Sequence, residues 1–293
     1  MAIAAMACVQ FGVAISFDLA PRVGAEAIVW LRLSWAALVL TAIARPPRGS
    51  FTRSAVRTCV VLGLVTAGMS MLFMAAVMRL PLGTASALEF LGPLGVAVAR
   101  GRGAARSWAG IAAAGVLMLT QPWQQTPDLL GVLLALAAAV CWAAYIVLTQ
   151  RAGDAMTGTR ALALSIPIAA LVSTSIAGPW EFGRLSWSLV AIGLGLALLM
   201  PVVPFSLELL ALRRLNTAAF GTLMSLEPAI AVIIGLVVLG QVPAPSGAVG
   251  VVLVVAAGIG AERTGARRER PFTAAPRRTD TDRAAAGSVG EAA

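Results

Sequence analysis

Apolar segments of membrane length recur along this chain from its first residue to about residue 261. A helix needs roughly 20 apolar residues to cross a bilayer, and somewhat fewer where the bilayer thins. A soluble domain could not bury so much apolar side chain, because 59% of the 293 residues are hydrophobic and only 12% are charged. The sequence therefore predicts an all-α membrane protein with ten transmembrane helices. Breaks at Pro, Gly and Arg clusters give approximate limits of 1–19, 26–44, 56–78, 83–99, 107–121, 129–149, 160–179, 186–210, 217–239 and 246–261.

All 22 basic residues are arginine, and their distribution predicts how the ten segments are oriented. If the N-terminus lies in the cytoplasm, 18 arginines fall in inner loops or the tail, three fall in outer loops, and Arg32 lies within a span. Such an excess on one side obeys the positive-inside rule. We therefore expect a multi-pass protein of the inner (cytoplasmic) membrane, embedded in the lipid bilayer, with both termini in the cytoplasm.

The missing residue types exclude several classes of site. The chain has no lysine and no histidine, so it cannot form a Walker A motif, a pyridoxal Schiff base, a Ser-His-Asp triad or an HExxH zinc site. Cys8, Cys59 and Cys141 lie far apart in apolar segments, which predicts small buried hydrophobes and no disulfide framework. We expect no catalytic residues, metal, cofactor or nucleic-acid partner, and so no enzyme.

Two stretches of the chain resemble each other in kind and in spacing. Leu80 and Leu215 each follow an arginine at the end of a segment, and a proline lies thirteen residues after each leucine, at Pro93 and Pro228. The offset of 135 residues spans five helices. Because five is odd, the second copy must be upside down relative to the first. Inverted repeats of this kind hold a substrate site near the membrane midplane, between the two halves.

The duplication divides the chain into three parts. A weaker matching pair, Arg22 and Arg151, each two residues before a glycine, extends the likeness to the start of each half. The sequence thus predicts two inverted five-helix repeats, residues 1–121 and 129–261. Residues 262–293 are rich in Arg, Ala, Gly, Pro and acidic residues, which predicts a disordered basic cytoplasmic tail.

Small residues in the fifth and tenth segments predict close helix packing. We interpret these two helices as structural elements and not as walls of a cavity. The small residues are Gly110, Ala114, Gly115, Gly247, Gly250 and Gly258.

Three stretches carry a family resemblance. They are Ala87-Leu-Glu-Phe-Leu-Gly-Pro-Leu-Gly-Val-Ala97, Pro204-Phe-Ser-Leu-Glu-Leu-Leu-Ala-Leu-Arg-Arg-Leu215 and Phe220-Gly-Thr-Leu-Met-Ser-Leu-Glu-Pro-Ala-Ile-Ala231. With them the chain resembles the EamA-type drug/metabolite transporters, and among these the threonine/homoserine exporter family, over about residues 5 to 261. The resemblance implies ten spans in two EamA-type repeats and export of small amino acids driven by an ion gradient. The chain departs from the family at Gln241-Val242, where the family tends to have Gly-Glu.

Four charged side chains fall within predicted spans: Arg32, Glu89, Glu208 and Glu227. Each costs about 2.5 to 3.5 kcal/mol on insertion scales, so such groups face the bundle interior. Arg32 and Glu89 match in depth and have opposite charge, so we expect them to pair or to share a polar cavity. Arg32 could clamp a substrate carboxylate or form a structural ion pair. Glu89 could carry a proton or bind an amine. Glu227 could line the central cavity or form a hydrogen bond to a neighbouring helix. Glu208 is expected to make a structural contact with the inner loops.

Helix-breaking prolines lie close to these charges. Pro93 and Pro228 lie in corresponding spans, and Pro204 interrupts the eighth. Each proline removes a backbone donor and frees a carbonyl, which could hold an ammonium group beside a cavity or could simply form a hinge. Gln10 and Tyr145 are polar side chains at a depth suited to substrate contact.

These features predict a secondary active transporter that exports small polar amino acids, threonine- or homoserine-like, or related metabolites by alternating access, with protons as the expected coupling ion. A zwitterion suits a cavity that holds both signs of charge: Arg32 for its carboxylate, and Glu89 or Glu227 for its ammonium. The main alternative is an exporter of the same superfamily with another substrate, such as hydrophobic cations. A membrane-embedded enzyme would need an acidic cluster that the sequence lacks, and a scaffold or receptor would not transport.

Overall fold

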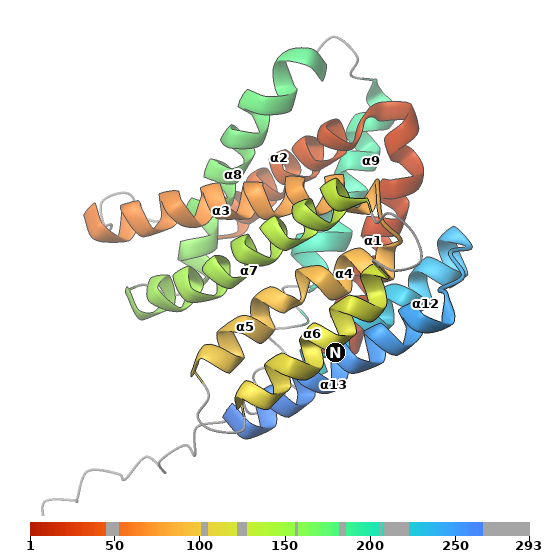
Figure 1. Cartoon of the computed structure of the whole chain (residues 1–293). Coiled ribbons are helices and arrows are strands. Elements are labelled where there is room, and N and C mark those ends of the chain that lie inside the picture. The colour runs from red at the N-terminus through yellow and green to blue at the C-terminus, as the bar shows by residue number, and fades with distance from the viewer. Residues whose placement is uncertain are drawn as a thin grey trace, which may run out of the picture.

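The computed structural model describes residues 1–44, 53–100, 105–121, 128–155, 158–181, 186–204, 207 and 223–265. All regular structure within those residues is helical (Figure 1). The helices of the first half are α1 (Ala2–Val23), α2 (Ala25–Ala44), α3 (Arg53–Val77), α4 (Leu82–Glu89), α5 (Leu91–Arg100) and α6 (Ala105–Thr120). Those of the second half are α7 (Leu129–Ala155), α8 (Gly158–Glu181), α9 (Trp187–Ala197), the π-helical turn η2 (Leu198–Val202), α12 (Glu227–Leu239) and α13 (Pro245–Gly265).

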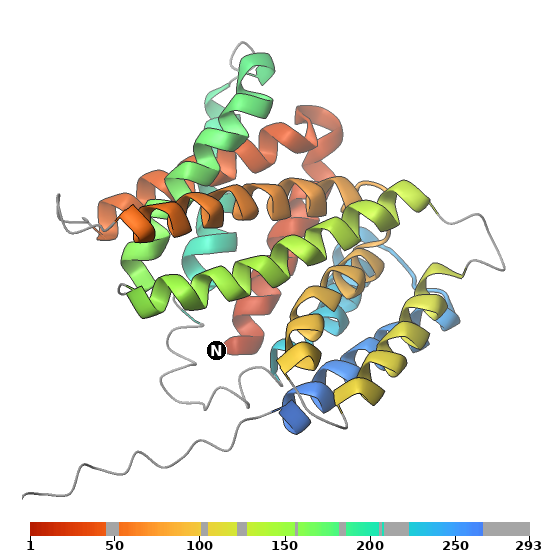
Figure 2. The same ribbon diagram turned by 60° about the vertical axis from the view of Figure 1, so that its left-hand side comes forward.

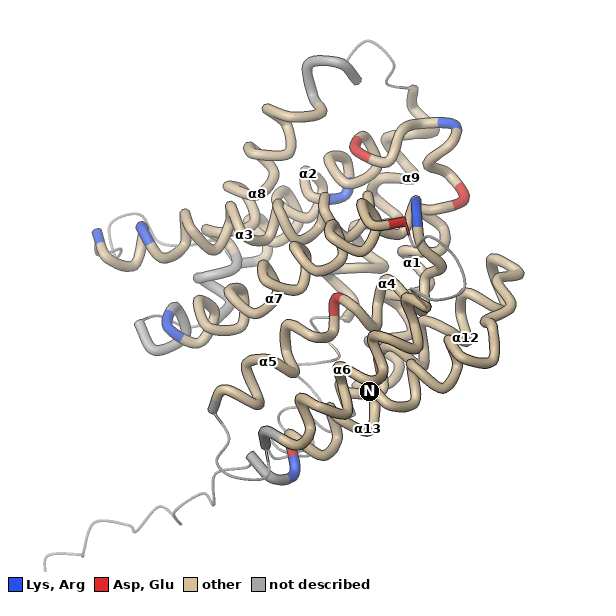
Figure 3. The backbone as a smooth tube through the Cα atoms, viewed as in Figure 1, with Lys and Arg blue, Asp and Glu red and all other residues tan. Residues whose placement is uncertain are grey.

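The length and surface of these helices are those of a membrane protein. Within the residues that the structure describes, six helical spans are long and apolar enough to cross a bilayer, and four further apolar helices are shorter. Large apolar side chains are openly exposed on them, such as Val140 at 70%, Leu171 at 69% and Val237 at 75%, which favours lipid over water. Charged residues gather toward helix ends (Figure 3). The prediction of an all-helical, multi-pass membrane protein is confirmed at this level.

Two of the three predicted proline breaks, at Pro93 and Pro228, interrupt their helices. The first lies at Phe90, between the end of α4 at Glu89 and the start of α5 at Leu91. Pro93 has no N–H to donate to the Glu89 carbonyl four residues earlier, which explains this break. The second break lies at Ser225 and Leu226, directly before α12. Phe90 and Ser225 are separated by 135 residues, as are Pro93 and Pro228.

The two breaks meet at one glycine of α13. A Cβ added to Gly258 would lie 2.7 Å from Cε1 of Phe90 and 2.8 Å from Oγ of Ser225. A side chain there would therefore push both interrupted helices away. The predicted close packing of Gly258 is confirmed.

Helices α6 and α13 pack side by side through a second pair of glycines (Figure 2). A Cβ on Gly115 would lie 2.9 Å from the carbonyl oxygen of Gly250, and a Cβ on Gly250 would lie 2.7 Å from that of Gly115. The predicted small-residue contact is thus confirmed for this pair. It is wrong for Gly110 and Gly247, because a Cβ at either position would meet open space.

Several of the remaining contacts are reciprocal. Helix α1 packs on α12, and α7 packs on α4. Gly63 of α3 lies against Ser165 and Ile168 of α8, and Gly193 of α9 lies against Leu31 of α2. Helices α2 and α8 also pack on each other, as do α4 and α12. The core is therefore built mainly from contacts between the first and second halves of the chain.

Candidate functional site

A buried polar contact joins α1 to both interrupted helices. Gln10 is 1% exposed, and its Nε2 donates to Oε1 of Glu227 at 3.1 Å and, at 3.5 Å, to Oγ of Ser86. Glu227 is the first residue of α12, and Ser86 lies three residues before Glu89 on α4. The predicted residues Gln10 and Glu227 are thus brought into direct contact from opposite ends of the chain.

Arg32 is buried on α2 but is not directly paired with a carboxylate. Its side chain is 9% exposed, and its Nη1 lies 2.7 Å from Sδ of Met200 in η2. Among the described residues, one pair of oppositely charged side chains lies within 4 Å, and it is Arg79 with Asp128. Arg32 and Glu89 therefore do not form the direct ion pair that was one of the two expectations from sequence. The reason is that the π-helical turn inserts Met200 against Arg32.

The interior charges still act on one another. Glu89, which is 8% exposed, interacts electrostatically with both Arg32 and Glu227. Arg32 in turn feels the charge of Glu89. When all three side chains are ionised, these described groups carry one positive and two negative charges. Such a cluster can bind a further cationic group, and it offers opposite charges to a molecule that carries both.

The η2 turn is held against α1 as well as α2. A Cβ on Gly12 of α1 would collide with the Met200 side chain. π-Helical turns are rare and are frequent at functional sites. The irregular helix thus carries Met200 to a point between Gly12 and the Arg32 guanidinium.

The other predicted site residues have less specific surroundings. Pro228 and Pro204 are buried and Pro93 is half-buried. Tyr145 is half-buried on α7, three residues after Trp142. Trp142 packs edge-on against Phe90, with ring centroids 6.3 Å apart, and so covers the α4–α5 break.

A cavity of about 370 Å³ opens elsewhere, at the end of the bundle near the start of α4. Polar groups on its wall are Thr84, Thr120, Gln121, Asp128 and Gln241, and the rest of its wall is mainly apolar. The described residues that line it include none of the interior charges. This hollow is therefore separate from the Arg32–Glu89–Glu227 cluster.

Gln241 has a role that its sequence position did not reveal. Its Oε1 accepts a hydrogen bond from the backbone N–H of Leu82 at 2.8 Å. Leu82 is the first residue of α4, and Gln241 lies two residues after the end of α12. The Gln241 amide oxygen therefore caps the N-terminus of α4. The cap is thus made by a neutral side chain.

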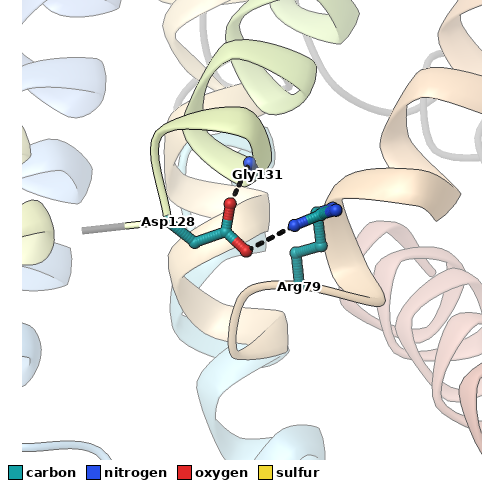
Figure 4. Close-up of polar contacts among 3 residues, drawn as sticks. All are labelled: Arg79, Asp128 and Gly131. Carbon is teal, nitrogen blue, oxygen red and sulfur yellow. Dashed lines mark hydrogen bonds and ion pairs between the residues drawn. The ribbon is translucent and has the colours of Figure 1, made fainter. Parts of the chain in front are cut away.

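A second contact at the same end was also not foreseen. Nη1 of Arg79 lies 2.8 Å from Oδ2 of Asp128, and Oδ1 of Asp128 accepts from the backbone N–H of Gly131 at 2.9 Å (Figure 4). The Gly131 hydrogen bond and then Arg79 lower the pKa of Asp128 below its usual value. The pair fastens the α3–α4 connection to the start of α7.

Some predicted features lie outside the described residues. These are Glu208 and most of the tail 262–293. In the part of the chain that is described, no group of three or more His, Cys, Asp or Glu side chains could hold a metal ion.

Comparisons with known proteins agree with the helical architecture. The profile of the EamA-like transporter family matches residues 129–260. The threonine/homoserine exporter RhtA of Escherichia coli (strain K12) is 38% identical over 265 residues, which cover 89% of each chain. That of Salmonella typhimurium (strain LT2) is 38% identical over 269 residues, or 90% of each. A solved crystal structure, 19% identical, covers 91% of this chain and 97% of its own with a TM-score of 0.59, which shows a shared fold.

Proposed function

Because the chain belongs to the EamA-like transporters, and among them to the threonine/homoserine exporter family, we propose that it is a secondary active transporter that exports threonine, homoserine and similar small polar amino acids. The observation that carries this proposal is 38% identity to the exporter over 89% of both chains. Likeness over that length includes both halves of the molecule and not a single shared segment.

The chemistry of the interior supports a zwitterionic substrate. Threonine and homoserine each carry one carboxylate and one ammonium group. The Arg32 guanidinium suits the carboxylate, since Met200 sulfur is a weak hydrogen-bond acceptor that a carboxylate can displace. Glu89 and Glu227 suit the ammonium. Gln10 and Tyr145 complete the set of side chains that we assign to substrate binding or coupling.

We assign the fold to ten transmembrane helices in two inverted EamA-type repeats, residues 1–121 and 129–261. Two structural features support this. The helix breaks at Phe90 and Ser225 have the offset of 135 residues that separates Pro93 from Pro228. Gly115 and Gly250 also have this offset, and they contact each other reciprocally. Reciprocal contact between equivalent residues is what a two-fold axis between the repeats requires.

Transport proceeds by alternating access, in which the halves rock around the interior charges. Arg32, Glu89 and Glu227 are each less than a tenth exposed, so the conformation described is closed around them. The broken helices and η2, next to Pro93, Pro204 and Pro228, are the segments best suited to bend. Protons serve as the coupling ion, because the excess negative charge of the cluster can accept one.

The membrane placement follows from the arginine distribution. We infer that the protein lies in the inner membrane with both termini in the cytoplasm. The two ends of the bundle then face opposite compartments, and the Arg79–Asp128 contact lies on the outer one.

The proposal is tested with purified protein in liposomes. Liposomes loaded with unlabelled threonine should accumulate radiolabelled threonine and homoserine by counterflow, and an imposed pH gradient should change net flux. The protein should add nothing to the exchange of a hydrophobic cation such as tetraphenylphosphonium beyond the passive exchange seen in protein-free liposomes. Exchange of the cation without exchange of either amino acid would contradict the assigned substrate. An amino acid flux that is the same with and without the pH gradient would contradict proton coupling.

A further inference from the structure

The amide of Gln10 is only half satisfied. Its Nε2 donates to Glu227 and lies within reach of Ser86, but its Oε1 is buried and has no hydrogen-bond partner. Buried polar atoms are nearly always paired, so an exception in a tight helix contact requires an explanation. Turning the amide over would not remove the problem, because Oε1 would then face the Glu227 carboxylate oxygen.

Packing alone does not require a polar pair at this place. The two repeats can be compared position by position. With the offset of 135 residues, Glu227 corresponds to Gly92. With the offset of 129 residues that separates Arg22 from Arg151 near the start of each repeat, Gln10 corresponds to Ala139. Gly92 and Ala139 are also in contact: a Cβ on Gly92 would lie 2.9 Å from the Ala139 carbonyl carbon. The crossing of α5 with α7 is therefore made with small residues, whereas the equivalent crossing of α1 with α12 uses an amide and a carboxylate.

We propose that Gln10 Oε1 and the Glu227 carboxylate together form the ammonium half of the substrate site, and that Gln10 makes the transporter select ligands with several N–H donors. This inference rests on the proposed function. A primary ammonium has three N–H groups, so it can donate to Glu227 and to Gln10 Oε1 at once. The contact between Nε2 and Glu227 holds the amide with its oxygen ready for the second bond.

A quaternary ammonium has the same charge but no N–H. It would be attracted to Glu227 while leaving Gln10 Oε1 unpaired. The site thus distinguishes an α-amino acid from its fully methylated analogue by hydrogen bonding and not by charge, since a site built to hydrogen-bond a group rejects an analogue that lacks it.

The test is competition against radiolabelled homoserine bound to the purified full-length protein, with homoserine and N,N,N-trimethylhomoserine as competitors. In the wild type the trimethyl compound should bind at least roughly tenfold more weakly, the effect of losing charge-assisted hydrogen bonds. In Gln10→Met, which keeps length but removes the acceptor, the ratio should fall clearly below that of the wild type but stay above one, because the trimethyl compound still has no N–H to donate to Glu227. Ser86→Ala is the matched control, because it removes the other Nε2 partner, and it should keep the wild-type ratio.

Equal binding of the two compounds by the wild type would overturn the inference without any variant, and so would full discrimination by Gln10→Met. Failure of the wild type to bind homoserine at all would instead overturn the proposed function on which the inference rests.

Discussion

Arg32 of α2 and Met200 of η2 are in direct contact, with Nη1 and Sδ 2.7 Å apart. A thioether is a poor partner for a guanidinium, whose planar N–H groups match a carboxylate. The contact therefore holds Arg32 in place without using its binding capacity. In this account the substrate carboxylate replaces Met200.

Replacing Arg32 should abolish export. Arg32→Ala removes the group proposed to hold the substrate carboxylate, so threonine counterflow should fall at least about a hundredfold, the cost of a buried charged contact. The matched control is Arg22→Ala, since Arg22 is exposed at the end of α1. Counterflow is compared at equal amounts of inserted protein. Equal counterflow rates in the two variants would show that Arg32 does not hold the substrate.

Neutralising either interior carboxylate should also impair transport. Glu89→Gln and Glu227→Gln keep the side-chain shape but remove the negative charge that attracts the ammonium, so we expect at least about a tenfold loss of counterflow for each. Glu26→Gln is the control, because Glu26 is exposed in the first turn of α2. A Glu227→Gln protein with wild-type counterflow would contradict the role assigned to this residue.

The glycine contact between α6 and α13 should be sensitive to a single methyl group. Gly115→Ala places a Cβ 2.9 Å from the Gly250 carbonyl oxygen, and overpacking of this kind costs about 1 to 3 kcal/mol. The melting temperature should fall. Gly110→Ala on the same helix adds its Cβ in open space and should leave the melting temperature unchanged or raise it, because alanine favours helix. The reverse order would show that the two helices do not pack through Gly115.

The Arg79–Asp128 contact should survive mild acid. The lowered pKa of Asp128 means that the folded protein keeps this carboxylate ionised more readily than the unfolded chain does. Its stabilisation is therefore present above the unfolded value of about 3.9 and is lost as pH falls through the lower folded pKa.

Melting temperatures of the wild type and Asp128→Asn, measured from pH 8 to 3, test this. The difference should stay constant down to about pH 4 and shrink below it. Asp18→Asn, at an exposed position on α1, serves as the control for general charge effects. A difference that already vanishes near pH 6 would contradict the lowered pKa.

The sequence contained enough information for the helical class, the family and the positions of the proline breaks. Apolar length and charge distribution are local properties, and Pro93 acts on the helix that contains it. The interior charges were also identifiable, because an ionised group in an apolar span is costly wherever it faces. Gln10 and Glu227 were each identified as polar residues within spans, but their direct contact was not predicted.

The partners of several residues could not be predicted, because they depend on three-dimensional packing. Arg32 was expected to pair with Glu89 or to share a polar cavity with it, yet the π-helical turn places Met200 against it. Pro204 predicted an interruption of this span but not that it would be π-helical. Gln241 and Leu82 are 159 positions apart, and Gln241 was noted only as a departure from the family. Arg79 and Asp128 lie 49 positions apart, and nothing in their local sequence indicates that they form an ion pair.

Arg32, Glu89 and Glu227 are proposed to recognise both charges of an amino acid. The most direct measurement is competition for radiolabelled threonine binding by two analogues, threoninol, which lacks the carboxylate, and N-acetylthreonine, which lacks the ammonium. Unlabelled threonine should displace the label, and both analogues should fail to do so at concentrations tenfold higher. Displacement by threoninol or by N-acetylthreonine as effective as that by threonine would contradict it.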